Sequence, residues 1–187
     1  TVLLNDIYSK TNIATIHAIM TTQIATNTPN SLQSLADILA GNLPTYIAPY
    51  HPLNKTGNAK GVLIGGNLSV LCNSIGTKTD IDTTNKLLLL EDLDEYLYHI
   101  DRLMLHLDRA GKLANLAGLL VGSLTDMKDH EIPFGKAAEE IVHHYAAKYN
   151  YPIAFGIPIG HITDNRAIII GAETQLVVDD NQTKLLV

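Results

Sequence analysis

Several short segments of the chain are made almost entirely of apolar residues. The clearest lie at residues 61–64, 86–90, 116–121 and 152–155. Because their apolar residues do not alternate with polar ones, these segments match strands that are covered on both faces. A shorter segment at residues 13–16 predicts one further strand. The pattern therefore predicts a set of mostly buried strands.

Between these segments, apolar residues recur at the spacing of an α-helix. The longest case follows Glu91, where one face carries Leu93, Leu97, Ile100, Leu103, Met104 and Leu107. This spacing predicts a long helix that begins at Asp92 or Asp94 and ends at Gly111. Further helices are predicted at residues 1–11, at residues 31–41 with Ser31 as cap and Gly41 as stop, at residues 68–75 and at residues 134–149.

The C-terminal segment carries short apolar runs at residues 167–170, 175–178 and 184–187, separated by turn residues. This spacing predicts a meander of three strands. Strands that alternate with helices and then end in hairpins indicate an α/β fold with a mixed sheet and a C-terminal β meander.

The composition is typical of a soluble α/β protein. Of the 187 residues, 46% are hydrophobic and 17% are charged, so a core can form without disulfides or a structural metal. The net charge is −6 and the basic residues are scattered, which disfavours nucleic acid as a partner. No segment has the length of a membrane span, and the single cysteine, Cys72, allows no disulfide and no zinc cluster of thiolates. We therefore predict neither a metal nor another cofactor.

Glu91 is the first candidate for chemistry. It directly follows the apolar segment 86–90 and so stands at the carboxyl end of a predicted strand. Open α/β sheets place their ligand-facing groups at the carboxyl ends of strands. A carboxylate in this position can equally cap the helix that follows and interact with its dipole. Both interpretations stay open from the position of Glu91 alone.

His161 is the second candidate. It ends the loop segment 155–161, in which two glycines and Pro158 restrict the backbone around one imidazole. A histidine held in this way suits the role of a general base, although a loop histidine can also be exposed without any role. Other histidines lie on predicted helices without the spacing of a zinc site, and we interpret them as surface or boundary residues: His99, His106, His143 and His144.

Gly65, Gly66 and Asn67 lie between a predicted strand and a predicted helix. Glycines let a ligand approach the backbone closely, and a helix N-terminus can hold an anion. The segment lacks the Walker lysine and the third glycine of a dinucleotide fingerprint. We therefore interpret these three residues as candidates for substrate binding and expect no nucleotide.

A carboxylate and a histidine suit a hydrolase triad, but the sequence offers no clear nucleophile. No G-x-S-x-G motif occurs, Ser69 lies one turn into a predicted helix, and Ser123 follows a predicted strand. The nucleophile is therefore expected outside these residues.

Three ordered segments carry a family resemblance: KGVLIGGNLS at residues 60–69, LEDLDEYLYHIDR at residues 90–102 and GIPIGH at residues 156–161. Together they resemble the serine LD-carboxypeptidase family, which includes murein tetrapeptide carboxypeptidases and microcin-immunity peptidases. The resemblance implies a swivelling β/β/α domain with a catalytic glutamate and histidine, and a separate N-terminal domain with the serine. Glu91 and His161 fall on the two catalytic positions, and Glu95 is the competing choice for the glutamate.

The resemblance also implies a domain division and a set of partners. Residues 1–20 match the linker helix and crossover after the serine motif, with His17-Ala18-Ile19-Met20 in place of His-Gly-Pro-Met, and residues 21–187 form the C-terminal domain. The chain is then expected to lack the serine and to be inactive alone. The implied partners are a murein tetrapeptide, the N-terminal domain and, as one option, a second copy in a homodimer, in a cytoplasmic bacterial enzyme of peptidoglycan recycling. The alternatives are cleavage of a peptidyl- or aminoacyl-nucleotide and an inactive binding domain.

Overall fold

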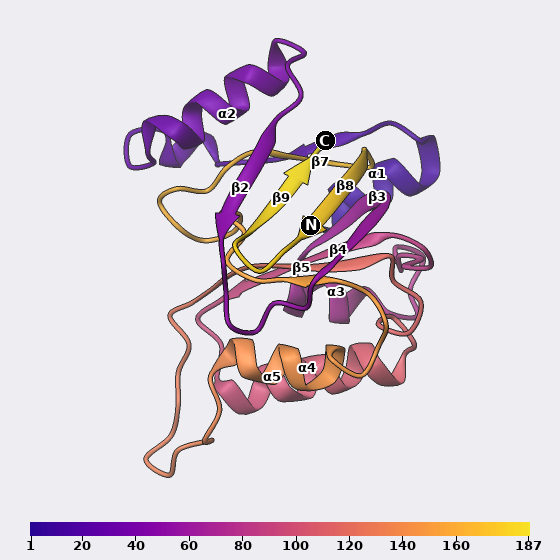
Figure 1. Ribbon diagram of the computed structural model, residues 1–187, viewed down its shortest axis with the longest axis vertical. Coiled ribbons are helices and arrows are strands. Elements are labelled where there is room, and N and C mark those ends of the chain that lie inside the picture. The colour runs from indigo at the N-terminus through magenta and orange to yellow at the C-terminus, as the bar shows by residue number, and fades with distance from the viewer.

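A mixed sheet of seven strands forms the centre of the computed structural model, which describes all 187 residues (Figure 1). Its order is β2-β9-β8-β3-β4-β5-β6, with β3 to β6 parallel and the other three strands antiparallel to their neighbours. The strands are β2 (Thr45–Pro49), β3 (Gly57–Asn67), β4 (Leu87–Leu93), β5 (Gly118–Thr125), β6 (Ile153–Ala154), β8 (Glu173–Val178) and β9 (Gln182–Leu186). The prediction of an α/β fold with a mixed sheet is confirmed.

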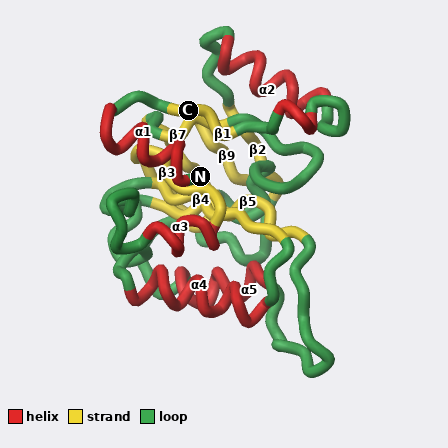
Figure 2. The backbone as a smooth tube through the Cα atoms, turned by 180° about the vertical axis from the view of Figure 1, so that it is seen from behind, coloured by secondary structure: helices red, strands yellow, loops and turns green.

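The remaining elements are five α-helices, a short 3-10 helix and two strands outside the main sheet. They are α1 (Val2–Thr11), β1 (Thr15–His17), η1 (Thr21–Gln23), α2 (Pro29–Leu39), α3 (Leu68–Ser74), α4 (Leu97–Arg109), α5 (Ala138–Ala146) and β7 (Ile168–Ile170). Figure 2 shows α3, α4 and α5 on one side of the sheet and α2 at the far end of the molecule. No helix has both the length and the apolar character needed to cross a membrane.

The parallel strands are buried on both faces, as their continuous apolar sequences predict. In β4, Leu88 and Leu90 face a core that includes residues of α3, α4 and α5. Leu87 and Leu89 face a second core, which is formed with β2, β7, β8 and β9. The sheet therefore separates two apolar layers. Polar groups can lie at the ends of its parallel strands.

Several predicted boundaries were wrong because strand pairing extends further than local sequence suggests. Gly65 and Gly66 do not form a turn, since β3 continues in register with β4 through Asn67. Similarly, β4 continues beside β5 past a register shift, so Asp92 and Leu93 belong to the strand and the helix begins only at Leu97. Neither Asp92 nor Asp94 starts that helix.

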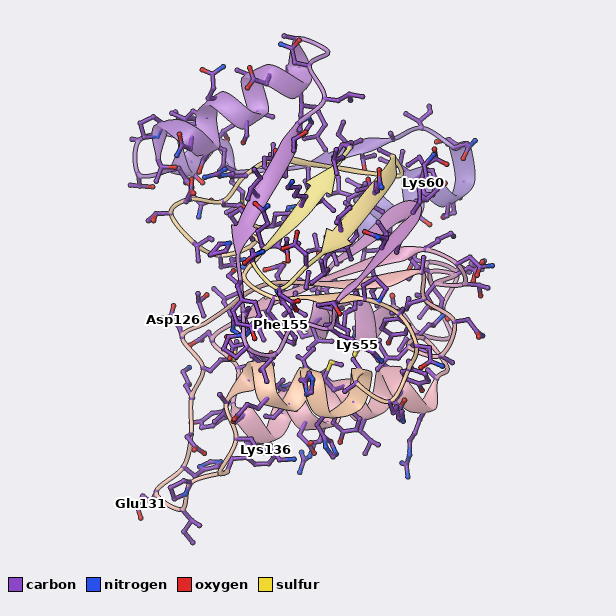
Figure 3. The ribbon with its side chains drawn as sticks, viewed as in Figure 1. Lys55, Lys60, Asp126, Glu131, Lys136 and Phe155 are labelled. Carbon is purple, nitrogen blue, oxygen red and sulfur yellow. The ribbon has the colours of Figure 1, made fainter.

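The C-terminal meander is confirmed only for its last two strands. β8 and β9 form an antiparallel hairpin, but β7 pairs with β1 from the other end of the chain. The cap of α2 is Thr28, whose hydroxyl accepts the hydrogen bond of the Ser31 N–H, and not Ser31 itself. The helix predicted from residue 134 begins at Ala138, because residues 126–137 form a projecting loop, here called the arm (Figures 1 and 3).

Candidate active site

An open cavity of about 1010 Å³ lies at the carboxyl ends of β3 and β4. It is lined from four parts of the chain: the start of α1, the segment after β1, the ends of the two strands, and the loop that contains residues 160–165. Open α/β sheets bind their ligands at this edge, because the loops after parallel strands meet there. The polar strand ends predicted from sequence therefore come together in one cavity.

Glu91 lies on β4 at the bottom of this cavity and is only 1% exposed. Two glycines make room for it. A Cβ on Gly122 would lie 3.3 Å from Glu91 Cβ, and a Cβ on Gly160 would lie 2.9 Å from Glu91 Oε2. The two glycines, from β5 and from the loop after β6, therefore let the backbone close around a buried carboxylate.

His161 stands beside Glu91, with 40% of its side chain exposed. Its Nδ1 donates a hydrogen bond to Glu91 Oε2 at 2.7 Å. The loop is held by neighbouring polar groups, since the Gly160 N–H donates to Asn165 Oδ1 and Thr125 Oγ1 donates to the His161 carbonyl. The arrangement leaves Nε2 as the ring nitrogen that can accept a proton.

The electrostatics of this pair are set by burial. Burial raises the pKa of Glu91, and His161 opposes that rise through its charge and its hydrogen bond. An ionised carboxylate at Nδ1 stabilises an imidazolium, so the pair can accept a proton at Nε2 and later donate it. This is the chemistry of an oriented general base.

Glu95, the competing glutamate, belongs to a different pair. Its Oε2 accepts a hydrogen bond from Nδ1 of His99, four residues further along the chain, at 2.5 Å. Glu95 also lines the cavity. The structure thus contains two Glu–His pairs, and His161 belongs to the one with Glu91.

Of the three candidate substrate-binding residues, only Asn67 lines the cavity. Its side chain is already engaged: Oδ1 accepts from the Val70 N–H, and Nδ2 donates to Asp92 Oδ1 at 2.7 Å. Both backbone groups of Gly65 are bonded to the Asn5 side chain at 2.9 Å. Gly66 faces Thr1, whose Oγ1 would lie 2.8 Å from an added Cβ.

Sequence reasoning assigned no role to two other residues in this cavity, Thr1 and His17. The His17 Nδ1 is buried without a hydrogen-bond partner. Burial lowers the pKa of His17 to about 4, and the positive charges of the N-terminus and of His161 act in the same direction. The only sequence signal for His17 was its place in the segment that resembles His-Gly-Pro-Met. No group of three or more His, Cys, Asp or Glu side chains is arranged to hold a metal ion.

Comparison with protein families gives a match over residues 60–176 to the LD-carboxypeptidase C-terminal domain. A relative named probable murein peptide carboxypeptidase, from Bacillus subtilis, is 33% identical over 175 residues, which cover 91% of this chain and 55% of the relative. The murein tetrapeptide carboxypeptidase of Pseudomonas aeruginosa is 31% identical over 138 residues, which cover 73% of this chain and 44% of the relative.

Solved structures show the same fold. A muramoyltetrapeptide carboxypeptidase from Oxalobacter formigenes superposes with a TM-score of 0.88 at 20% identity, over 98% of this chain and 64% of the other. The microcin self-immunity protein MccF in its wild-type apo state gives a TM-score of 0.79 at 18% identity, over 100% of this chain and 64% of the other.

The chain spans about half the length of the curated relatives that it matches. The family match covers both Glu91 and His161 as well as most of the main sheet. The expected family is therefore confirmed, and this chain belongs to the LD-carboxypeptidase family, with its matched region in the C-terminal domain of that family.

Proposed function

We propose that this chain is the C-terminal catalytic half of a serine carboxypeptidase that releases terminal D-alanine from murein tetrapeptides. The observation that carries the proposal is the 2.7 Å contact between His161 Nδ1 and the buried Glu91 carboxylate in an open cavity. The printed names of the relatives from Bacillus subtilis and Pseudomonas aeruginosa support the substrate class. Glu91 orients the imidazole, and His161 is the general base.

The proposed reaction is acyl transfer through a serine on a segment that precedes Thr1. His161 Nε2 takes the hydroxyl proton as the serine oxygen bonds to the carbonyl carbon of the L,D-amide. The C–N bond then breaks, and the proton passes from His161 to the amine of the leaving D-alanine. A water molecule, activated by the same histidine, hydrolyses the resulting ester and frees the serine.

The position of Thr1 supports a nucleophile from that segment. Thr1 lines the same cavity as His161, and its side chain accepts a hydrogen bond from the Asn67 N–H at 2.9 Å. A residue joined directly to Thr1 would therefore enter the cavity beside the proposed base.

The test is release of D-alanine from L-Ala-D-Glu-diaminopimelate-D-Ala by the full-length protein. We expect His161→Ala and Glu91→Gln to lower kcat/KM by about 1000-fold or more, because each removes part of the proton-transfer unit. The matched control is His99→Ala, which breaks the second Glu–His pair and is expected to change kcat/KM by less than about threefold.

Each outcome of this experiment has a defined meaning. If the full-length protein releases no D-alanine, the murein substrate is wrong, and cleavage of an aminoacyl-nucleotide becomes the next reaction to assay. Loss of activity in His99→Ala with full activity in His161→Ala would reverse the assignment of the two pairs. Activity of the 187-residue chain alone would contradict a nucleophile outside it.

The wider setting also belongs to this proposal. We infer a cytoplasmic enzyme of peptidoglycan recycling that acts with its own N-terminal domain, and a homodimer remains one option for its assembly. The division into residues 1–20 as linker and residues 21–187 as domain also stays a prediction, because the family match begins only at residue 60.

A further inference from the structure

Ser123 has a buried hydroxyl for which the fold provides no partner. It lies on β5, next to β4, and its backbone N–H donates to the Ile159 carbonyl at 2.8 Å. The Oγ atom is buried and makes no hydrogen bond. Leaving a buried hydroxyl without a hydrogen-bond partner is unfavourable, so a Ser in this position calls for a partner nearby.

The candidate partner is the Glu91 carboxylate, which borders Gly160 as Ser123 does and forms no hydrogen bond with Ser123 in this structure. A Cβ built on Gly160 would lie 2.4 Å from Ser123 Oγ and 2.9 Å from Glu91 Oε2. The two oxygens therefore border the same small space, which is left open by the missing glycine side chain. The only hydrogen bond of the Glu91 carboxylate comes from His161. A carboxylate oxygen can accept more than one hydrogen bond, so Glu91 has capacity for a second donor.

We propose that Ser123 is a positioning residue for the Glu91–His161 pair, and that its hydroxyl donates to the Glu91 carboxylate. This inference rests on the proposed role of the pair. The hydrogen bond holds the carboxylate ionised and in place while His161 carries the proton taken from the nucleophile. Ser123 itself does not contact substrate, since its hydroxyl is buried.

The surroundings of Glu91 explain why a donor is needed there. Burial and, to a smaller extent, the neighbouring charge of Asp92 raise its pKa, whereas the charge and the hydrogen bond of His161 lower it. A second hydrogen-bond donor at the carboxylate would act in the same direction as His161 and favour the ionised form.

The experiment is a pH titration of the Glu91 side-chain carboxyl by ¹³C NMR in the full-length protein, with the resonance assigned from Glu91→Gln. Without the hydroxyl donor, the ionised carboxylate loses stabilisation, so its pKa must rise. We expect the titration midpoint to rise by about 1 pH unit in Ser123→Ala. Ser123→Thr keeps a hydroxyl and is expected to stay within about 0.3 unit of the wild-type midpoint.

The matched control is Ser69→Ala. Ser69 lines the cavity, and its hydroxyl donates to Asn67 Oδ1 at 2.8 Å and not to Glu91. Its removal is expected to leave the Glu91 midpoint unchanged.

The inference is overturned if Ser123→Ala titrates like the wild type, or if Ser123→Thr shifts as far as Ser123→Ala. The titration needs no substrate, so its result is independent of the peptidase assay. A wild-type protein without peptidase activity would refute the proposed function, and the measured midpoints would still decide whether Ser123 donates to Glu91.

Discussion

At the scale of single residues, the site depends on glycines that leave room as much as on charged side chains. The buried carboxylate of Glu91 fits only because Gly122 and Gly160 have no side chains. Gly160 has a φ of 118°, which L side chains rarely adopt, so glycine is required there for conformation as well as for space. The glycine before His161 is therefore explained by the space that the Glu91 carboxylate occupies.

His17 gives a prediction about stability at acid pH. Its pKa is lowered to about 4 in the folded protein, compared with an ordinary value of 6.5. Between these values the unfolded chain binds a proton that the folded chain does not, so the free energy of unfolding falls as pH decreases from about 6.5 to about 4. We expect His17→Asn to remove about 2 kcal/mol of that fall, discounted for partial exposure.

The measurement is urea unfolding at pH 7 and at pH 4.5 for the wild type and for His17→Asn. Comparison of the two proteins at each pH cancels the contributions of other groups, among them Glu91. An identical pH dependence in both proteins would contradict a lowered pKa for the partly buried His17.

At the scale of elements, the contact between α1 and β3 decides where the N-terminus lies. Asn5 on α1 is 2% exposed and bonds both backbone groups of Gly65. Gly65 itself lies so close to β4 that an added Cβ would be 2.2 Å from the Leu89 carbonyl oxygen. These contacts hold the start of α1 against the strand ends and thereby place Thr1 in the cavity.

Asn5→Ala should therefore weaken the attachment of α1 to β3. It leaves two buried backbone groups of Gly65 without a partner, and we expect the free energy of unfolding to fall by about 2–4 kcal/mol. Chemical denaturation measures the loss. The control is Ser9→Ala on the same helix, where the hydroxyl is exposed and the change should stay within about 0.5 kcal/mol. Equal effects of both variants would show that the Asn5 contact is unimportant.

At the scale of the whole molecule, most of the chain packs around the two sides of the sheet, whereas the arm beyond Met127 projects away from it. Residues 129–137 are all exposed, and Figure 3 shows Glu131 and Lys136 on the projecting loop below the helices. Ile132 in the same loop is 86% exposed. The core therefore has few contacts to lose if the arm is cut.

Limited proteolysis tests this separation. We expect a Glu-specific protease to cut first after Glu131 and trypsin to cut first after Lys136, since exposed loop segments fit a protease site before folded elements do. The nicked protein should stay folded, with a Tm within about 3 °C of the intact protein. Mass spectrometry of the first fragments gives the sites, and a first cut within α4 or α5 would contradict the prediction.

The sequence by itself determined the α/β class, the buried strands and the candidate residues Glu91, Glu95 and His161. Apolar periodicity is a local property, so it predicted most elements correctly, and the polar residues after Leu90 and Gly160 indicated the candidate chemistry. Tertiary structure decided the features that depend on long-range pairing. These include the extension of β4 through Leu93, the pairing of β7 with β1, and the choice of Glu91 over Glu95 as the partner of His161. A hydrogen bond between residues 70 positions apart has no local pattern, because only the packed sheet brings its two atoms together.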